Sequence, residues 1–209
     1  MVLISIIEMG SNNLFSVVRA LDHLGVKHSI VKSSRKIISS DKIILPGVGS
    51  FPDGMKYLKN NNLIEPILEA NEKNVPILGI CLGMQLMADY GLEFVKTKGL
   101  GLVKGKVIDL PYDHNNPNHK NLIPNIGWRS LKINKSNLLF DKINNNSMMY
   151  FIHSYYLKLM DNSNLIATID VNGNYITAAF SKSNIVGVQF HPERSGDVGL
   201  TILKAFGNL

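Results

Sequence analysis

Cysteine is almost missing from this chain, since Cys81 is the only one among 209 residues. A single thiol excludes an intrachain disulfide framework and favours a reducing compartment. The sequence also lacks an apolar run long enough to cross a membrane, and its apolar start, MVLISII, has neither a basic lead nor a small-residue cleavage site. We therefore expect a cytoplasmic protein that has no membrane partner.

Basic clusters are absent too, although the chain carries a formal net charge of +6 and a pI of about 9.3. A basic pI can indicate nucleic-acid binding. Here the lysines never form a run of three, and no aromatic-rich basic stretch accompanies them. This pattern is typical of a solvated lysine-rich surface, and we expect no nucleic-acid partner.

Strands alternate with helices over residues 1–90, which is the pattern of a parallel sheet with helices on its faces. The length and the absence of an internal repeat or linker favour one domain spanning residues 1–209. We expect an α/β fold with an open, mostly parallel sheet flanked by helices. The expected elements are strands at Val2–Ile7, Lys27–Val31, Asp41–Leu45 and Pro76–Ile80, and helices at Asn13–Leu24, Asn62–Asn71 and Leu82–Tyr90.

The second half of the chain is richer in predicted strands, so additional antiparallel strands are expected there. Asn172-Gly173 between two of them is a hairpin signal. The polar segment Pro111–Asn121 should be a loop. The expected elements are strands at Gly101–Leu110, Ser130–Ile133, Met148–Leu157, Leu165–Asp170, Tyr175–Phe180 and Ile185–Gln189, and a final helix at Gly196–Phe206.

The lone cysteine lies in the pattern strand, Gly79-Ile80-Cys81-Leu82-Gly83, helix. This is the thiol counterpart of the nucleophile elbow, in which glycines on either side make room for a strained turn. The turn places the sulfur at a helix N-terminus, which favours the thiolate, and aims the Leu82 N–H at the same space, where it can hold an oxyanion. The alternative is a buried core cysteine, the commonest role of a lone thiol.

A catalytic cysteine needs a base, and His191 in the segment QFHPERS is the best placed of six histidines. Pro192 favours an extended backbone at His191, so Glu193 should lie beside the ring and hold it by a hydrogen bond. Cys81, His191 and Glu193 thus predict a catalytic triad, with a surface turn as the alternative for the last two. His153, inside an apolar strand, is either structural or lines a site.

The remaining histidines do not predict a metal site. His23 and His28 flank the end of the first predicted helix and should lie at the surface. His114 and His119 lie in the polar loop, where only Asp113 can add a further ligand, so we expect no metal.

The loop Pro46-Gly47-Val48-Gly49 follows the strand that ends at Leu45. Its glycines allow the backbone to approach a ligand closely, and ligands bind beyond the C-terminal ends of parallel strands. This loop and Cys81 should therefore meet at one edge of the sheet. A loop N–H can there complete an oxyanion hole with that of Leu82, although the motif alone also fits a plain tight turn.

Together, the segments PGVGSF, GICLGMQL and QFHPERS resemble the class I, or triad, glutamine amidotransferases. The resemblance covers the whole chain, and GLGLVKGKV, PNIGW, FIHSYY and SGDVGL make it closest to the glutaminase subunits of imidazole glycerol phosphate synthases. It implies the flavodoxin-like sheet of that family, a glutaminase activity in histidine biosynthesis and no cofactor.

The resemblance also assigns roles to individual residues. It implies that the Cys81 thiolate attacks the side-chain amide of L-glutamine, that His191 moves the protons and that Glu193 orients His191. The backbone N–H groups of Val48 and Leu82 are implied to hold the oxyanion. The residues implied to bind glutamine are Gly49, Gln85, Glu93, Ser154 and Tyr155.

A partner follows from the same resemblance: a separate synthase (cyclase) subunit, a (β/α)8 barrel that forms a heterodimer with this chain and receives its ammonia. Asn12, Asn125 and Trp128 are implied to face it. Their segments depart from the family pattern, because EMGSNN stands where Asp-Tyr-Gly-x-Gly-Asn is usual and PNIGWR where Pro-His-x-Gly-Trp-Asn is usual. An alternative is therefore a paralogous glutaminase that feeds a related synthase outside histidine synthesis, such as one that amidates a sugar for surface glycans.

Two alternatives come from other classes of protein. One is a non-enzymatic regulator or binding module on the same fold, against which the intact Cys81, His191 and Glu193 argue. The other is a cysteine peptidase or other thiol hydrolase, which a comparison of glutamine with peptide substrates would separate.

Overall fold

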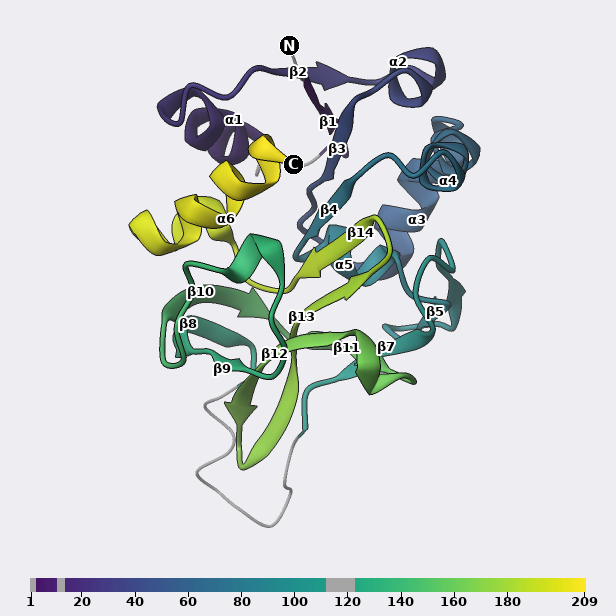
Figure 1. Cartoon of the computed structure of the whole chain (residues 1–209). Helices are drawn as coiled ribbons and strands as arrows, with labels where there is room; N and C mark the ends of the chain where they lie inside the picture. Colours follow the sequence, from purple (N-terminus) through teal and green to yellow (C-terminus); the bar gives the residue numbers. More distant parts are fainter. Residues whose placement is uncertain (1–2, 11–13, 112–122) are drawn as a thin grey trace.

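The centre of the molecule is an eight-stranded sheet. The computed structural model describes residues 3–10, 14–111 and 123–209 (Figure 1). In spatial order the strands are β2 (His28–Val31), β1 (Ile4–Ile7), β3 (Lys42–Leu45), β4 (Ile77–Ile80), β14 (Ile185–Val188), β13 (Asn174–Lys182), β12 (Leu165–Val171) and β9 (Lys132–Ile133). Neighbours are parallel from β2 to β14 and antiparallel from β14 to β9. The prediction of a mostly parallel sheet with antiparallel strands from the second half is confirmed.

Helices cover both faces of the parallel part of this sheet (Figure 1). Successive side chains of a strand point to opposite faces, so Ile6 of β1 belongs to one apolar core and Ile7 to the other. One face is covered by α1 (Leu14–His23) and α6 (Gly196–Asn208), and the other by α2 (Ser34–Ile38), α3 (Phe51–Asn60), α4 (Ile64–Glu72) and α5 (Leu82–Leu86). None of these described helices is long and apolar enough to span a bilayer.

Two smaller sheets and three short 3-10 helices complete the described chain. The first sheet is an antiparallel ribbon of β8 (Asn125–Ser130) and β10 (Met148–His153). The second contains β11 (Tyr155–Leu159), β7 (Gly105–Asp109), β5 (Tyr90–Gly91) and β6 (Thr97–Lys98). The 3-10 helices are η2 (Leu138–Phe140), η3 (Asn162–Asn164) and η4 (Pro192–Arg194).

The expected strand Met148–Leu157 is two strands in the structure, because Ser154 separates β10 from β11. The two halves bond to different partners, β10 to β8 and β11 to β7, so they enter different sheets. The expected strand Ser130–Ile133 divides in the same way at Leu131, between β8 and β9. Apolar patterning continues through both breaks, which is why the sequence alone did not reveal them.

Three helices also differ from expectation, and α2 was not expected at all. The helix predicted at Leu82–Tyr90 ends at Leu86, because Tyr90 pairs with Lys98 and Lys106 in a sheet instead. The helix α3 was missed, since Pro52 and Gly54 resemble turn signals. Ser50 caps it by accepting a hydrogen bond from the Asp53 N–H at 3.3 Å.

The predicted hairpin at Asn172-Gly173 is confirmed. These two residues join β12 to β13 and have φ angles of 57° and 77°, as the tightest hairpin turns require. Residues 112–121 of the predicted polar loop, with His114 and His119, lie outside the described residues.

Candidate active site

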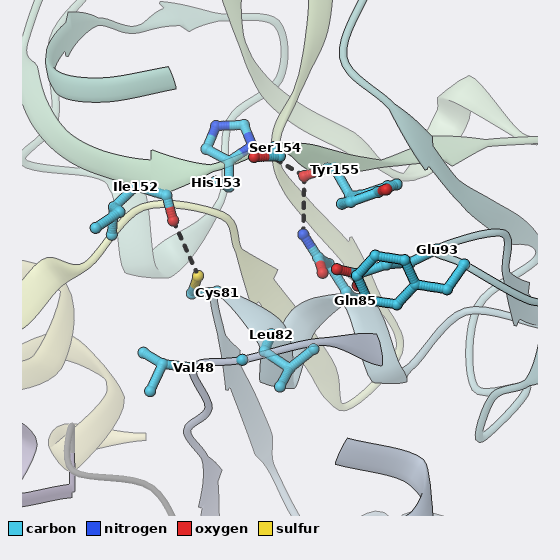
Figure 2. A pocket seen from close by; sticks show the side chains of 11 residues that line it. Val48, Cys81, Leu82, Gln85, Glu93, Ile152, His153, Ser154 and Tyr155 are labelled. Carbon is cyan, nitrogen blue, oxygen red and sulfur yellow. Dashed lines mark hydrogen bonds between the residues drawn. The ribbon is translucent and has the colours of Figure 1, made fainter. Parts of the chain in front are cut away.

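Cys81 occupies a strained turn between β4 and α5. Its φ of 53° and ψ of −110° form a conformation that a residue with a side chain keeps only when its surroundings impose it. The neighbouring strand supplies one such constraint, because the Cys81 N–H donates to the Val188 carbonyl oxygen of β14 at 2.8 Å. Cys81 as a whole is 5% exposed, and its sulfur faces a cavity, as Figure 2 shows.

The two glycines of the elbow are required by close backbone packing. A Cβ on Gly79 would lie 2.8 Å from the backbone nitrogen of Met84, and one on Gly83 would lie 1.8 Å from the carbonyl oxygen of Leu45. These are the collisions that the sequence pattern predicts. The helix that follows is shorter than predicted, so its dipole favours the thiolate less than a longer helix would.

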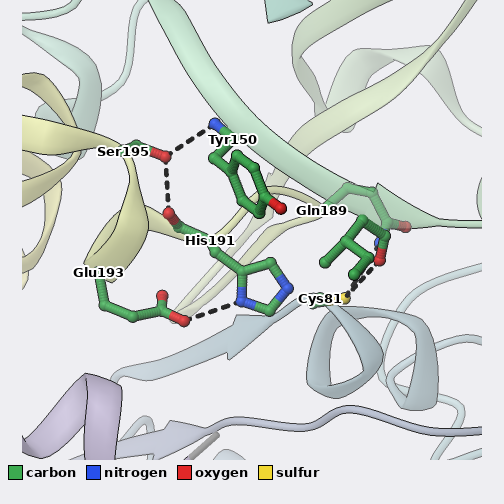
Figure 3. Close-up of polar contacts among 7 residues, drawn as sticks. Cys81, Tyr150, Gln189, His191, Glu193 and Ser195 are labelled. Carbon is green, nitrogen blue, oxygen red and sulfur yellow. Dashed lines mark hydrogen bonds and ion pairs between the residues drawn. The ribbon is translucent and has the colours of Figure 1, made fainter. Parts of the chain in front are cut away.

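His191 and Glu193 form the predicted pair, with 2.8 Å between Nδ1 and Oε1 (Figure 3). The backbone explanation was wrong, because residues 192–194 form the 3-10 helix η4 and not an extended segment. Only His191 itself is extended, at φ −100° and ψ 94°. Pro192 starts the tight turn that brings Glu193 back under the ring.

Ser195 fixes the backbone of His191 against the ribbon. Its hydroxyl donates to the His191 carbonyl oxygen at 2.6 Å and accepts from the Tyr150 N–H at 3.0 Å. The His191 N–H in turn donates to the Tyr150 carbonyl oxygen at 2.9 Å. The ring is therefore held from its backbone as well as from Glu193.

The electrostatics of His191 favour a protonated ring. Burial by itself lowers its pKa, but hydrogen bonds to Cys81 and Glu193 and the negative charges of both outweigh burial and raise the pKa to about 10. The imidazole thus interacts with both the sulfur and the carboxylate. This arrangement suits an imidazolium that hands a proton to a leaving group and takes one back.

His153 lines the cavity but is held as a neutral ring. Its Nδ1 donates to the Tyr155 carbonyl oxygen at 2.9 Å, which makes Nε2 the acceptor for the Asn125 amide, also at 2.9 Å. Burial lowers its pKa to about 4, and the nearby charges of His191 and Arg129 act in the same direction. His153 therefore both lines the site and supports it structurally.

The cavity beside Cys81 has a volume of about 480 Å³. Every residue proposed from the sequence to hold glutamine lines it, namely Gly49, Gln85, Glu93, Ser154 and Tyr155. The last four are labelled in Figure 2. Val48 and Leu82 line the cavity as well. Sequence reasoning missed Phe94, which no motif marks, and Ile152, which lies in the quoted segment FIHSYY but was given no role, and it left the place of His153 open.

Glu93 brings a negative charge to the cavity. One carboxylate oxygen accepts from the Phe51 N–H at 2.7 Å. Burial raises the pKa of Glu93, the Phe51 hydrogen bond lowers it, and the charges of Asp53 and Asp109 raise it further. A cationic group of a ligand would stabilise the Glu93 carboxylate against the cost of its burial and against repulsion by Asp53 and Asp109.

The oxyanion donors are not both available in this conformation. The Leu82 N–H, predicted to hold an oxyanion, donates to the Gly47 carbonyl oxygen at 3.3 Å. Gly49 has a φ of 115°, so only glycine fits easily at this point of the loop. Val48 and Leu82, the two predicted donors, line the same cavity. The carbonyl oxygen of the Gly47–Val48 peptide, however, faces the Leu82 N–H.

The residues expected to face a partner divide into three cases. Asn12 lies outside the described residues. Asn125 is fully buried, and its amide oxygen accepts from Arg129 Nε at 2.7 Å while its nitrogen donates to His153, so the expectation that its side chain faces a partner was wrong. Trp128 is half exposed on the ribbon.

No group of three or more histidine, cysteine, aspartate or glutamate side chains is arranged to hold a metal ion within residues 3–10, 14–111 and 123–209. His23 is exposed and His28 partly buried, where Nδ1 bonds to the Val26 carbonyl oxygen at 2.9 Å.

Comparisons with known proteins match this chain to a protein family. The family model for class I glutamine amidotransferases matches residues 5–207. The imidazole glycerol phosphate synthase subunit HisH of Caldanaerobacter subterraneus is 41% identical over 99% of this chain and 98% of its own length. HisH 1 of Legionella pneumophila strain Lens is 38% identical over 97% of each chain. Among solved structures, PurLQS of Thermotoga maritima is similar with a TM-score of 0.76, 22% identity and coverage of 99% of this chain and 98% of that one.

Proposed function

The chain belongs to the class I glutamine amidotransferases, and we propose that it is the glutaminase subunit of an imidazole glycerol phosphate synthase. It hydrolyses glutamine to glutamate and delivers ammonia to a separate synthase subunit for histidine biosynthesis. The observation that carries this assignment is Cys81 on a strained elbow at a cavity, in electrostatic interaction with a His191 ring that Glu193 holds. We further propose that residues 1–209 act as one domain, which the family match over residues 5–207 supports.

In the proposed reaction, Cys81 Sγ attacks the side-chain amide carbon of glutamine and forms a C–S bond. His191 gives its proton to the amide nitrogen as the C–N bond breaks, and ammonia leaves. A water molecule then loses a proton to His191 and adds to the thioester, and the C–S bond breaks to release glutamate. Glu193 keeps Nδ1 protonated and the ring oriented throughout, since its oxygen lies 2.8 Å from Nδ1.

The tetrahedral intermediates of this reaction need two backbone donors, for which we propose Leu82 and Val48. A rotation of the Gly47–Val48 peptide would remove the carbonyl oxygen from Leu82 and turn the Val48 N–H towards the cavity. A second cavity, of about 400 Å³, adjoins Val48, Gly49 and Leu82 and gives the loop room to move. Glutaminase activity should therefore be low until the loop rearranges.

Glutamine itself would be held by the walls of the cavity. We propose that the Glu93 carboxylate binds the α-ammonium group, because a buried negative charge at the cavity matches that group. Figure 2 shows Glu93 and Cys81 apart on the cavity wall, so the ligand can reach both with opposite ends. Gly49, Gln85, Ser154 and Tyr155 would bind its remaining polar atoms.

The synthase subunit would dock on the ribbon of β8 and β10. Alternation along the two strands puts Ile126 and Trp128 of β8 on the same face as Ile152 and Met148 of β10, and all four are exposed. Ile152 also lines the glutamine cavity. We propose that a (β/α)8 barrel covers this apolar face in a heterodimer, because ammonia must reach the acceptor without being protonated in bulk water.

The departures at residues 8–13 and 124–129 raised a synthase outside histidine biosynthesis as an alternative. The curated relatives favour imidazole glycerol phosphate synthase, because those with 37–42% identity over nearly the whole chain bear its name. The buried Asn125 offers a further reason, since its change from the family pattern lies inside the molecule rather than on the docking face.

A test uses the chain together with the synthase subunit from the same genome. Release of glutamate from free glutamine, and of none from peptides, supports the proposal against a peptidase. Cys81→Ala should abolish glutamine-dependent synthesis and leave ammonia-dependent synthesis intact, because the partner performs the second reaction. Loss of both activities would contradict this division of labour. Absence of a Cys81 adduct after incubation with a glutamine-derived diazo-ketone would favour a non-enzymatic role.

A further inference from the structure

Gln189 is a buried polar residue that takes no part in the proposed reaction steps. It follows β14, two residues before His191, and none of it is exposed. Its backbone N–H donates to the Ala178 carbonyl oxygen of β13 at 2.8 Å, which fixes its place on the sheet. A fully buried amide is unfavourable unless its donors and acceptor are paired, so we expect this side chain to have hydrogen-bond partners.

Those partners are the nucleophile and a wall of the glutamine cavity. Gln189 Nε2 donates to Cys81 Sγ at 3.7 Å (Figure 3). Gln189 Oε1 accepts from Gln85 Nε2 at 3.0 Å. Gln85 Nε2 also donates to the Tyr155 carbonyl oxygen at 2.9 Å. The Cys81 sulfur, the Gln85 side chain and the Tyr155 carbonyl thus belong to one chain of hydrogen bonds, in which Gln189 links the sulfur to Gln85.

The orientation of the two amides follows from this chain of bonds. The Tyr155 carbonyl can only accept, so the neighbouring atom of Gln85 must be its nitrogen. The Gln85 nitrogen donates its second hydrogen to Gln189, so the Gln189 atom that faces Gln85 must be the oxygen. The Gln189 nitrogen therefore faces the sulfur. The network leaves Gln85 Oε1 for a ligand and directs an N–H donor at Cys81.

We propose that Gln189 is a positioning residue for the nucleophile, a role that rests on the glutaminase function proposed above. Its N–H favours negative charge on Sγ and holds the sulfur towards the cavity, because a hydrogen bond to a charged acceptor is stronger than one to a neutral acceptor. Through Gln85 it also couples the sulfur to the wall that binds glutamine. Gln189 and His191 approach Cys81 from the same segment, so a single stretch of backbone places both donors.

The experiment measures the pH dependence of Cys81 alkylation by iodoacetamide in the folded chain, followed by intact mass. Gln189→Met keeps the length of the side chain and removes the donor. We expect its alkylation profile to move to higher pH by about one unit, equivalent to a roughly tenfold loss of thiolate at a given pH. Gln189→Glu should move it further, because a carboxylate oxygen would then face the sulfur.

Lys42→Met is the matched control. Lys42 is also a buried polar residue on the sheet, but its Nζ donates to the Gly207 carbonyl oxygen at 2.6 Å, at the end of α6 and outside the cavity lining. Its substitution should lower thermal stability and leave the alkylation profile unchanged. Thermal unfolding of each variant shows which ones are folded.

With the synthase partner present, both Gln189 variants should lose kcat for glutamine by roughly tenfold or more, with a smaller change in KM. An unshifted alkylation profile in whichever Gln189 variant is folded would overturn the proposal, and so would unfolding of both variants, which would make the residue purely structural. A shifted profile in a chain whose wild type never hydrolyses glutamine would instead refute the proposed function and leave the contact with the sulfur standing.

Discussion

The backbone N–H of Leu82 donates to the carbonyl oxygen of Gly47, with 3.3 Å between nitrogen and oxygen. That bond occupies a donor that the proposed oxyanion needs, so the isolated chain should turn over glutamine slowly. Addition of the synthase subunit should raise kcat by roughly a hundredfold, which is the scale of one oxyanion donor. Ammonia release with and without the partner measures this. Equal rates would mean that the Gly47 carbonyl does not limit the reaction.

Replacement of the two triad partners of Cys81 should have unequal effects. His191→Ala removes the group that carries the proton, whereas Glu193→Gln keeps a hydrogen bond to Nδ1 and removes only a charge. We expect Glu193→Gln to be milder by roughly a hundredfold in kcat, measured on glutamine with the synthase subunit present. Similar losses in the two variants would argue against the roles assigned to them.

The elbow glycine Gly83 should be far less tolerant of alanine than Gly54. A Cβ at Gly83 would overlap the Leu45 carbonyl oxygen, whereas one at Gly54 would lie 3.1 Å from the flexible side-chain ends of Leu86. Gly83→Ala should lower the free energy of unfolding by more than about 4 kcal/mol, or prevent folding. Gly54→Ala, within helix α3, should change it by less than about 1 kcal/mol. Urea unfolding of both variants is the measurement, and equal values would refute the steric account.

His153 should make the fold sensitive to acid. Its pKa is lowered from 6.5 to about 4 in the folded chain, so between these pH values the unfolded state binds more protons and stability falls as the pH falls. The loss should reach at most about 3 kcal/mol. His191 adds no slope in this window, because its raised pKa gives a contribution that is complete below pH 6.5 and is lost only towards pH 10.

His153→Gln can keep hydrogen bonds to Asn125 and Tyr155 but cannot titrate. The difference in unfolding free energy between this variant and wild type should therefore shrink from pH 6.5 to pH 4. Urea unfolding at several pH values, with the carboxylates common to both proteins, isolates the histidine. A difference that stays constant with pH would contradict the assignment.

The ribbon face should be the place where the synthase subunit binds. Trp128 is half exposed there and packs edge-on against Tyr150, with 6.0 Å between ring centroids. Trp128→Glu should weaken the complex by at least roughly tenfold, as expected for an aromatic anchor, and leave Cys81 alkylation unchanged. Met160→Glu, at another exposed apolar position just past β11, serves as the control and should bind normally. Calorimetric titration with the synthase subunit distinguishes them.

The sequence predicted those parts of the molecule whose cause is local. The glycines around Cys81, the hairpin at Asn172-Gly173 and the parallel strands follow from short-range sterics and patterning, and the structure has them. The contact of His191 with Glu193 was also predicted, but from the wrong backbone conformation, because Pro192 is compatible with both an extended segment and a 3-10 turn.

What the sequence did not reveal depends on pairings between distant segments. The break at Ser154 arises because β10 and β11 have different strand partners, and the buried place of Asn125 arises from its bonds to His153 and Arg129. The bond from Leu82 to Gly47 depends on the rotation of one peptide, which residue types do not fix. Gln189 stood in a quoted motif, but only the fold brings it to the sulfur.

The break at Ser154 has a mechanical consequence. Ile152 lies on the outer face of the ribbon, and the carbonyl of Tyr155, on the same short stretch of chain, anchors the amide of Gln85. A displacement of the outer surface by an arriving protein would be transmitted along this covalent path to the substrate chamber. Coupling between the proposed docking face and the cavity would therefore need no long-range rearrangement of the sheet.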